Sequence, residues 1–225
     1  MGSPCVLDVW VTLTAMASVT EVVGIGPLVL NATTRDPAQL ALATASLQQF
    51  SGGRVTLGIG AGAGSESPFS QEVTMFRGTP LDATRRRERV IETIAFLRTL
   101  WRGGQSYLGT QIGFDGVSGV LIPDPLPRIV VGANGPKMAA LAGVHGDGVN
   151  LHSSQRDLAG LMAIARDSAA AAGNDDLEIS VEAPFEPDWL DPDSEERRDM
   201  HALGVGRVQL SWNRTVGLGA LSPNL

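Results

Sequence analysis

Residues 36–62 read DPAQLALATASLQQFSGGRVTLGIGAG, and this stretch decides the fold class. Asp36 is a typical helix N-cap, and Pro37 fits the first helical position, where a missing N–H costs nothing. Apolar residues then recur at helical spacing until the glycine pair at 52–53, which is typical of a helix end. The apolar run at 55–59 follows and leads into a glycine loop. The stretch therefore predicts a helix, a buried parallel strand, and a loop at the carboxyl end of that strand, where α/β proteins bind phosphorylated ligands.

The same alternation continues on both sides of this stretch. Short apolar runs predict six strands, at residues 22–30, 55–59, 128–131, 149–151, 177–183 and 208–212. Helical patterns lie at residues 11–19, 36–53, 82–104, 135–144, 158–173 and 194–204. Residues 105–122 predict a small hairpin, and residues 60–82 predict a long loop. Strands that alternate with helices in this way indicate a parallel sheet in an α/β fold.

The helix predicted at residues 82–104 has the strongest amphipathic pattern. Its apolar stripe is formed by Val90, Ile94, Leu97 and Trp101. Charged residues surround the stripe, among them Arg86, Glu88, Arg89 and Glu92. An apolar stripe of this kind packs against a core, so we expect Arg85, Arg86 and Arg87, with Glu88 and Glu92, to form a solvent-exposed face.

Size and composition restrict the class of function. The chain has 225 residues, of which 43% are hydrophobic and 18% charged, as in a soluble globular protein. The net charge of −7 argues against nucleic acid or an anionic membrane as a partner, because both attract basic surfaces. No apolar run approaches the roughly 20 residues of a membrane span, and the single cysteine, Cys5, excludes an intramolecular disulfide. We therefore expect a cytoplasmic protein that acts on a small molecule.

The loop after residue 59 is the first candidate binding site. Gly60, Ala61 and Gly62 place backbone N–H groups at the carboxyl end of a strand, where they can approach a phosphate or a flavin ring. A dinucleotide-binding fingerprint fits poorly, because residues 65–68 (SESP) follow where a helix should open at once. The absence of Gly-Lys-Ser/Thr excludes a nucleotide triphosphatase loop. A sharp turn without function is the alternative.

The loop after the strand at 128–131 is the second candidate. It contains Asn134, Gly135, Pro136 and Lys137. We expect Gly135 to take a positive φ and Pro136 to occupy the first position of the next helix. The free N–H groups of that helix end, together with the ammonium of Lys137, predict an anion site. The alternative is an ordinary strand-to-helix turn with a solvated lysine.

The three histidines predict no metal site. His145, His152 and His201 are not spaced from acidic residues or cysteine as metal ligands are. His152 follows a predicted strand, so we expect it at the carboxyl end of that strand, which is the productive face of a barrel. A polar loop residue is the alternative interpretation, and the sequence identifies no catalytic acid or base.

Several motifs occur in order along the chain. They are residues 20–26 (TEVVGIG), 35–37 (RDP), 51–54 (SGGR), 57–62 (LGIGAG), Trp101, 131–137 (VGANGPK) and 146–148 (GDG). Taken together, they resemble the luciferase-like monooxygenase superfamily, which includes flavin-dependent oxygenases and oxidoreductases that use coenzyme F420. The resemblance covers residues 6–155 well and the remainder weakly.

This resemblance implies a TIM-type (β/α)8 barrel whose cofactor lies across the carboxyl ends of the strands. In such relatives the ring system rests near a bulge at the end of the third strand, which corresponds here to Pro27, Leu28 and Val29. The phosphate tail is held by amides equivalent to those of Gly60, Ala61, Gly62, Asn134, Gly135, Pro136 and Lys137. We take coenzyme F420 as the cofactor, with FMN as the alternative, because 16 of the 17 basic residues are arginine and this composition suits organisms that make F420.

The chain departs from the family pattern at its start. A full barrel begins with two further strand–helix units before residues 4–8, and those strands usually carry the residue that protonates or orients the substrate. We therefore expect an incomplete TIM-type (β/α)8 barrel with about six parallel strands, as a single amino-terminally truncated domain over residues 1–225. Its edge strands, at 22–30 and 208–212, would carry unpaired amides. Pairing of such edges between two copies would give a homodimer.

Two functions from different classes follow. The first is a flavin- or F420-dependent oxidoreductase that acts by hydride or oxygen transfer. The second is a non-catalytic cofactor-binding protein or an inactive truncated homologue, since the usual acid–base residues are absent. An unrelated TIM-barrel phosphate binder is a third alternative.

Overall fold

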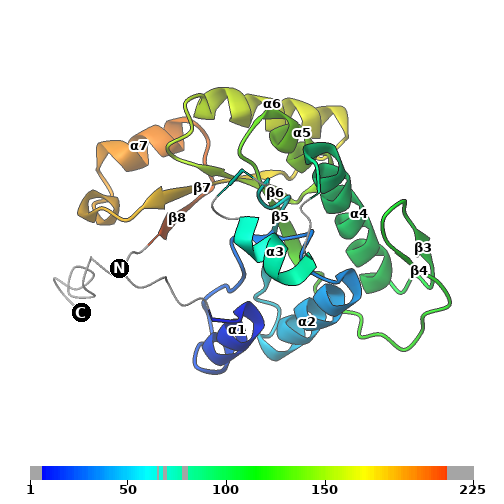
Figure 1. Cartoon of the computed structure of the whole chain (residues 1–225). Coiled ribbons are helices and arrows are strands. Elements are labelled where there is room, and N and C mark those ends of the chain that lie inside the picture. The colour runs from blue at the N-terminus through cyan, green and yellow to red at the C-terminus, as the bar shows by residue number, and fades with distance from the viewer. Residues whose placement is uncertain (1–6, 65, 68–69, 78–80, 212–225) are drawn as a thin grey trace. The chain divides into compact units, whose positions relative to one another are not determined.

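The computed structural model describes residues 7–64, 66–67, 70–77 and 81–211. Cys5 and Trp212 lie outside these residues, as do parts of the loop predicted at 60–82. The chain divides into two compact units, Met1–Gly132 and Ala133–Leu225. Each unit has three parallel strands, in the orders β1-β2-β5 and β6-β7-β8 (Figure 1). The predicted α/β class with about six parallel strands is confirmed.

The first unit contains four helices and five strands within the described residues. The elements are α1 (Val9–Ser18), β1 (Leu30–Asn31), α2 (Pro37–Phe50), β2 (Thr56–Gly60), α3 (Gln71–Arg77), α4 (Ala83–Trp101), β3 (Tyr107–Leu108), β4 (Gly113–Phe114) and β5 (Arg128–Gly132). β1, β2 and β5 pair in parallel, whereas β3 and β4 form the predicted antiparallel hairpin. The helix α3 lies within the stretch predicted as a loop.

Aspartate side chains begin three helices of this unit. Asp8 accepts the N–H groups of Trp10 and Val11 at 3.0 and 3.1 Å, which starts α1. Asp36 and Asp82 cap α2 and α4 in the same way. Each carboxylate satisfies N–H groups that have no partner within the helix. The helices predicted at 11–19, 36–53 and 82–104 are confirmed.

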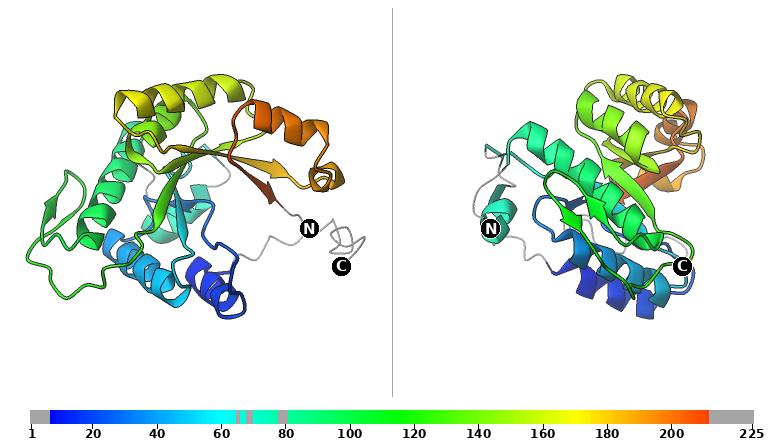
Figure 2. Two further views of the ribbon diagram at one scale, coloured as in Figure 1. Left: turned by 180° about the vertical axis from the view of Figure 1, so that it is seen from behind. Right: turned by 90° about the vertical axis from the view of Figure 1, so that its right-hand side faces the viewer.

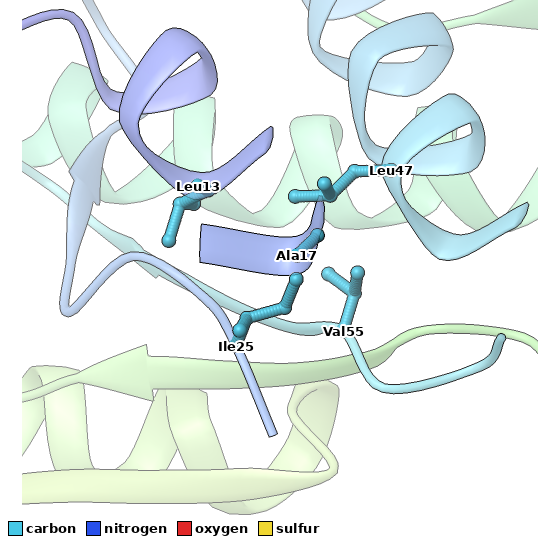
Figure 3. Close-up of a cluster of buried hydrophobic side chains, with 5 residues drawn as sticks. All are labelled: Leu13, Ala17, Ile25, Leu47 and Val55. Carbon is cyan, nitrogen blue, oxygen red and sulfur yellow. The ribbon is translucent and has the colours of Figure 1, made fainter. Parts of the chain in front are cut away.

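A cluster of apolar side chains joins α1, α2 and the start of β2. Figure 3 shows Leu13 and Ala17 of α1 close to Leu47 of α2, together with Ile25 and Val55. Each of the five residues is at most 9% exposed. Burial of these side chains therefore holds α1 and α2 side by side over the sheet of the first unit.

Arg54 fastens the end of α1 to the residues that precede β2. Its guanidinium donates to the carbonyl oxygens of Ala17, Thr20 and Val23 at 3.2, 2.7 and 2.5 Å. Its Nε donates to the carbonyl oxygen of Ser51 at 2.7 Å. The last carbonyl groups of a helix have no partner within it, so a cation at this position is favourable. The SGGR motif thus has a structural role.

The strand predicted at residues 22–30 is wrong over most of its length. Regular pairing is confined to β1, with one isolated bridge between Ile25 and Val55. Val22 is 88% exposed, so the apolar run that favoured a buried strand is not buried at its start. Between the bridge and β1 the segment contacts β2 through the carbonyl oxygens of Ile25 and Pro27, which accept the N–H groups of Thr56 and Gly58. Pro27 has no N–H to donate, so a regular ladder does not form there.

The β3–β4 hairpin lies beside α4 and is fastened to it by Glu92 (Figures 1 and 2). The Glu92 carboxylate accepts the N–H groups of Thr110, Gln111 and Ile112 at 2.9, 2.8 and 3.0 Å, and also accepts the Thr110 hydroxyl. Glu92 is only 9% exposed. The predicted solvent-exposed face is therefore wrong at this residue, because a hairpin 18 residues downstream covers it.

The second unit alternates strands and helices as predicted. Its elements are α5 (Pro136–His145), β6 (Gly148–His152), α6 (Leu158–Ala171), β7 (Glu178–Pro184), the 3₁₀ helix η2 (Pro187–Leu190), α7 (Glu195–Ala202) and β8 (Arg207–Ser211). Figure 2 shows α5 and α6 side by side. Gly143 permits this approach, because a Cβ atom there would lie 2.2 Å from the carbonyl oxygen of Ala165. None of the helices described in either unit is both long and apolar enough to cross a membrane.

Candidate functional site

Val29 lies over three glycines at the carboxyl ends of β2 and β5. A Cβ atom at Gly58, Gly60 or Gly132 would lie 3.0, 2.9 or 2.9 Å from a γ-carbon of Val29. Only glycine leaves this space, so the three positions form a floor on which the Val29 side chain rests. The peptide bond between Leu28 and Val29 is cis. The packing of Val29 on these glycines brings two predicted site segments, Pro27–Val29 and the start of the glycine loop, into contact.

Leu28 and Val29 are partly exposed above this floor. Leu28 is 45% exposed and Val29 is 39% exposed. The backbone beneath them is fixed, because the Pro27 carbonyl oxygen accepts the N–H of Gly58 at 3.1 Å. The two side chains thus offer an apolar surface on a rigid support, as a flat apolar ring would require.

Asn31 connects the end of β1 to the glycine loop. Its Oδ1 accepts the N–H and the hydroxyl of Thr33 at 2.9 and 2.8 Å. A Cβ atom at Gly62, where φ is +65°, would overlap the Asn31 side chain at 2.3 Å. Glu72 of α3 accepts from Asn31 Nδ2 and from the Thr34 hydroxyl at 3.4 and 3.2 Å. The Gly62 conformation is therefore required by packing within the protein itself.

Two arginines of α4 lie near these loops. The guanidinium of Arg86 lies about 3.5 Å from the position that a Cβ atom would occupy at Gly64, and its Nη1 donates to the Leu81 carbonyl oxygen at 2.8 Å. The Nε of Arg86 is buried without a hydrogen-bond partner among the described residues. Arg89 is 6% exposed and its Nε donates to the Ala32 carbonyl oxygen at 3.3 Å. Two guanidinium groups of α4 therefore lie near the carboxyl ends of β1 and β2, where the Glu72 carboxylate also lies.

The second predicted loop lies in the second unit, between β5 and α5. Asn134 and Lys137 are exposed, and Pro136 begins the helix as predicted. Gly135 is the N-cap residue with φ −178°, so the expected positive φ is wrong. This backbone is extended, and any residue can adopt it. No side chain of the described residues caps α5, in contrast to α1, α2 and α4. Pro136 has no N–H, and the N–H groups of Met138 and Ala139 donate to the Gly135 carbonyl oxygen at 3.1 and 3.0 Å, so the N–H of Lys137 is the donor that this first turn offers to a ligand or to water.

One face of the β6–β7–β8 sheet is polar. Asn150 Nδ2 donates to Ser180 Oγ at 3.1 Å and to Gln209 Oε1 at 3.0 Å, which joins the three strands side chain to side chain. Asn150 and Ser180 are buried. His152 and Glu182 lie two residues further along β6 and β7, on the same face and near the carboxyl ends. This face is the most polar part of the described core of the second unit.

His152 lies at the carboxyl end of β6, as predicted from the sequence. Its Nε2 is 2.9 Å from Glu182 Oε2, and its Nδ1 is 2.7 Å from Ser154 Oγ. Sequence reasoning missed Ser154 and Glu182. Glu182 is opposite His152 in the register of β6 and β7, which no spacing along the chain reveals. Ser154 follows His152 by two residues. A serine this close to a histidine at the end of a predicted strand is visible in the sequence and could have been named as a candidate site residue.

Comparison with known proteins places these features in a family. The family model described as luciferase-like monooxygenase matches residues 1–216. A 5,10-methylenetetrahydromethanopterin reductase of Methanolobus tindarius is 34% identical over 178 residues, which is 78% of this chain and 52% of that protein. An F420-dependent hydroxymycolic acid dehydrogenase of Mycobacterium tuberculosis is 34% identical over 176 residues, which is 77% of this chain and 47% of that protein.

A solved structure supports the fold. An F420-dependent secondary alcohol dehydrogenase, in complex with an F420-acetone adduct, matches with a TM-score of 0.71 and 20% identity over 88% of this chain and 67% of that one. At 20% sequence identity, this similarity shows a shared fold. The chain spans about half the length of the curated relatives that it matches.

Proposed function

Because this chain belongs to the luciferase-like monooxygenase family, we propose that it acts as a coenzyme F420-dependent oxidoreductase on a small-molecule substrate. The observation that carries the proposal is the 34% identity, over about three quarters of this chain, to a dehydrogenase whose name states F420 dependence. Reduced FMN with oxygen transfer is the alternative chemistry within the same family. When bound, the deazaflavin would supply hydride transfer, and the protein would supply position and electrostatics.

In this proposal Pro27, Leu28 and Val29 support the cofactor ring. Leu28 and Val29 are apolar, partly exposed, and held in place by the glycine floor formed by Gly58, Gly60 and Gly132. An apolar platform of this kind stabilises a planar ring by removing its face from water. These residues would hold the ring beside the carboxyl ends of the strands.

The proposed anion-binding groups are backbone N–H groups supplemented by positive side chains. In the first unit they come from the loop of Gly60, Ala61 and Gly62, next to the arginine of α4 that lies beside Gly64. In the second unit they come from Asn134, Gly135 and the uncapped start of α5, with Pro136 at its first position and Lys137 exposed beside it. Helix starts and guanidinium groups are both favourable neighbours of phosphate.

Replacing Gly135 tests the anion site directly. No atom of the described residues lies within 4 Å of a Cβ atom built at Gly135, and its backbone is extended, so a side chain fits there. Both Asp and Asn are good N-cap residues, so neither Gly135→Asp nor Gly135→Asn should destabilise α5. We expect Gly135→Asp to bind F420 at least about 10-fold more weakly than Gly135→Asn, because only Asp places a negative charge against the phosphate.

The measurement is quenching of F420 fluorescence by each purified variant, with the thermal unfolding midpoint as a check on folding. Equal affinity of the two variants, at the wild-type value, would show that the phosphate is held elsewhere.

A non-catalytic cofactor-binding protein is the second candidate. The observation that favours it is that the chain spans only about half the length of its curated relatives. Turnover separates the two functions: an enzyme oxidises or reduces bound F420 in the presence of a hydride acceptor or donor, whereas a binding protein holds the cofactor unchanged. We further propose a cytoplasmic location and a homodimer, the latter because unpaired strand edges favour association.

A further inference from the structure

Three side chains at the carboxyl ends of β6 and β7 form a continuous hydrogen-bonded chain. Ser154 Oγ lies 2.7 Å from His152 Nδ1, and His152 Nε2 lies 2.9 Å from Glu182 Oε2. A hydroxyl, an imidazole and a carboxylate in this order are the arrangement by which proteins activate a serine. The proposed cofactor chemistry uses none of the three residues.

The direction of the hydrogen bonds follows from one backbone group. The N–H of Ser154 donates to His152 Nδ1 at 3.1 Å. A backbone N–H can only donate, so Nδ1 of the neutral imidazole must be an acceptor and the ring proton must be on Nε2. Nε2–H then donates to Glu182, and the hydroxyl of Ser154 donates to Nδ1. The imidazole is thus held in the tautomer that can accept the serine proton.

The positions of the three residues are fixed by the sheet. His152 is opposite Glu182 in the parallel register of β6 and β7. The N–H of Ser153 donates to the Glu182 carbonyl oxygen at 2.8 Å, and the N–H of Gln155 donates to the His152 carbonyl oxygen at 3.0 Å. These two bonds hold the turn that carries Ser154 against both strand ends. The chain of side chains is therefore built on rigid elements, which keeps it aligned.

The group is open to a reactant at the serine end and more enclosed at the carboxylate end. Ser154 is exposed, the His152 side chain is 42% exposed and the Glu182 side chain is 21% exposed. The Gln155 side chain donates to Asn134 Oδ1 at 3.3 Å, which connects this turn to the loop before α5. The first turn of α5 follows that loop, and its N–H at Lys137 is a donor of the kind that stabilises an oxyanion, because the N–H groups of Met138 and Ala139 already donate to the Gly135 carbonyl oxygen.

We propose that Ser154 is an activated nucleophile that accepts acyl groups from small, unhindered esters. Its Oγ attacks the ester carbonyl carbon, and its proton passes to His152 Nδ1. The carbon–oxygen bond to the alcohol then breaks, and the alcohol leaves with that proton. Water, deprotonated by the same imidazole, releases the acid and restores the serine, so the net reaction is ester hydrolysis. Glu182 positions the imidazole and stabilises its charged form.

The test uses the purified full chain without any cofactor, so its outcome is independent of the proposed oxidoreductase function. A fluorophosphonate probe, which loses fluoride as serine Oγ bonds to phosphorus, is expected to give one adduct on Ser154 by peptide mass spectrometry. p-Nitrophenyl acetate should be hydrolysed at the same site. Ser154→Ala should abolish both reactions, whereas Ser153→Ala, on the same turn, should leave both at the wild-type rate.

His152→Asn is the decisive variant. Its side-chain oxygen can still accept the N–H of Ser154 and so keep the turn, but it cannot take a proton. We expect labelling and hydrolysis to fall roughly 100-fold, the size of effect typical of a lost general base. Glu182→Gln should also lower both rates, because the amide cannot stabilise the charged imidazole as the carboxylate does. An unlabelled Ser154 in the folded protein, or wild-type rates in His152→Asn, would show that the three residues form only a structural turn.

Discussion

Replacing Gly26 by alanine is expected to destabilise the first unit by about 3 kcal/mol, near the upper end of the usual cost of overpacking. A Cβ atom at Gly26 would lie 1.8 Å from the carbonyl oxygen of Thr56 in β2. This neighbour is backbone rather than the end of a flexible side chain. It cannot move easily either, because the N–H of Thr56 donates to the Ile25 carbonyl oxygen at 2.9 Å. The segment that carries Leu28 and Val29 would have to lift off β2.

Gly24→Ala is the matched control on the same segment. The nearest atom to a Cβ built at Gly24 is the Arg54 carbonyl oxygen at 3.7 Å, an ordinary contact. We expect this variant to change the free energy of unfolding by less than about 0.5 kcal/mol, as for surface substitutions. Urea unfolding followed by circular dichroism gives both values. Similar values for the two variants would mean that the segment does not cross β2 as closely as described.

Glu92→Ala is expected to lower the free energy of unfolding at pH 7 by about 3 kcal/mol, since an unsatisfied buried donor costs about 1–3 kcal/mol. Three backbone N–H groups of the hairpin, those of Thr110, Gln111 and Ile112, would lose their acceptor. Glu88→Ala, one turn earlier on α4 and bonded only weakly to Gln111 at 3.5 Å, is the matched control and should have little effect.

The same carboxylate makes stability depend on pH. Burial raises the pKa of Glu92, but the hydrogen bonds from Thr110, Gln111 and Ile112 outweigh it and hold the pKa below the ordinary value of 4.5. A depressed pKa means that the stabilisation is fully present above the unfolded-state value and is lost as the pH falls through the folded-state value. We therefore expect Glu92→Gln to remove part of the loss of stability that the wild type shows below about pH 4.5. The same acid dependence in both proteins would contradict an ionised, hydrogen-bonded Glu92.

Local signals predicted most of the fold. The helix α2 needs only Asp36 at its start, Pro37 in its first turn and the glycine pair at 52–53, and all of these are visible in the sequence. Errors occurred where distant residues decide the outcome. The sequence pattern predicts that Glu92 is exposed on its helix, but the β3–β4 hairpin covers it in the folded chain. The apolar run at 22–30 predicts a buried strand, but regular pairing with β2 begins only at Leu30, after one isolated bridge at Ile25.

The candidate site was predicted only in part. The two loops after β2 and β5 follow from glycines after apolar runs, and the placement of Pro27, Leu28 and Val29 came from the family resemblance. The packing of Val29 on Gly58, Gly60 and Gly132 depends on three segments that meet only in the folded chain. The pairing of His152 with Glu182 likewise depends on strand register. Contacts of this kind are not encoded in any spacing of residues along the chain.

Equilibrium titration of the purified chain with F420 and, separately, with FMN tests the central claim most directly. We expect saturable quenching of F420 fluorescence at one cofactor per chain, with F420 bound more tightly than FMN. A chain that is folded by circular dichroism and yet binds neither cofactor, or binds FMN alone, would contradict it.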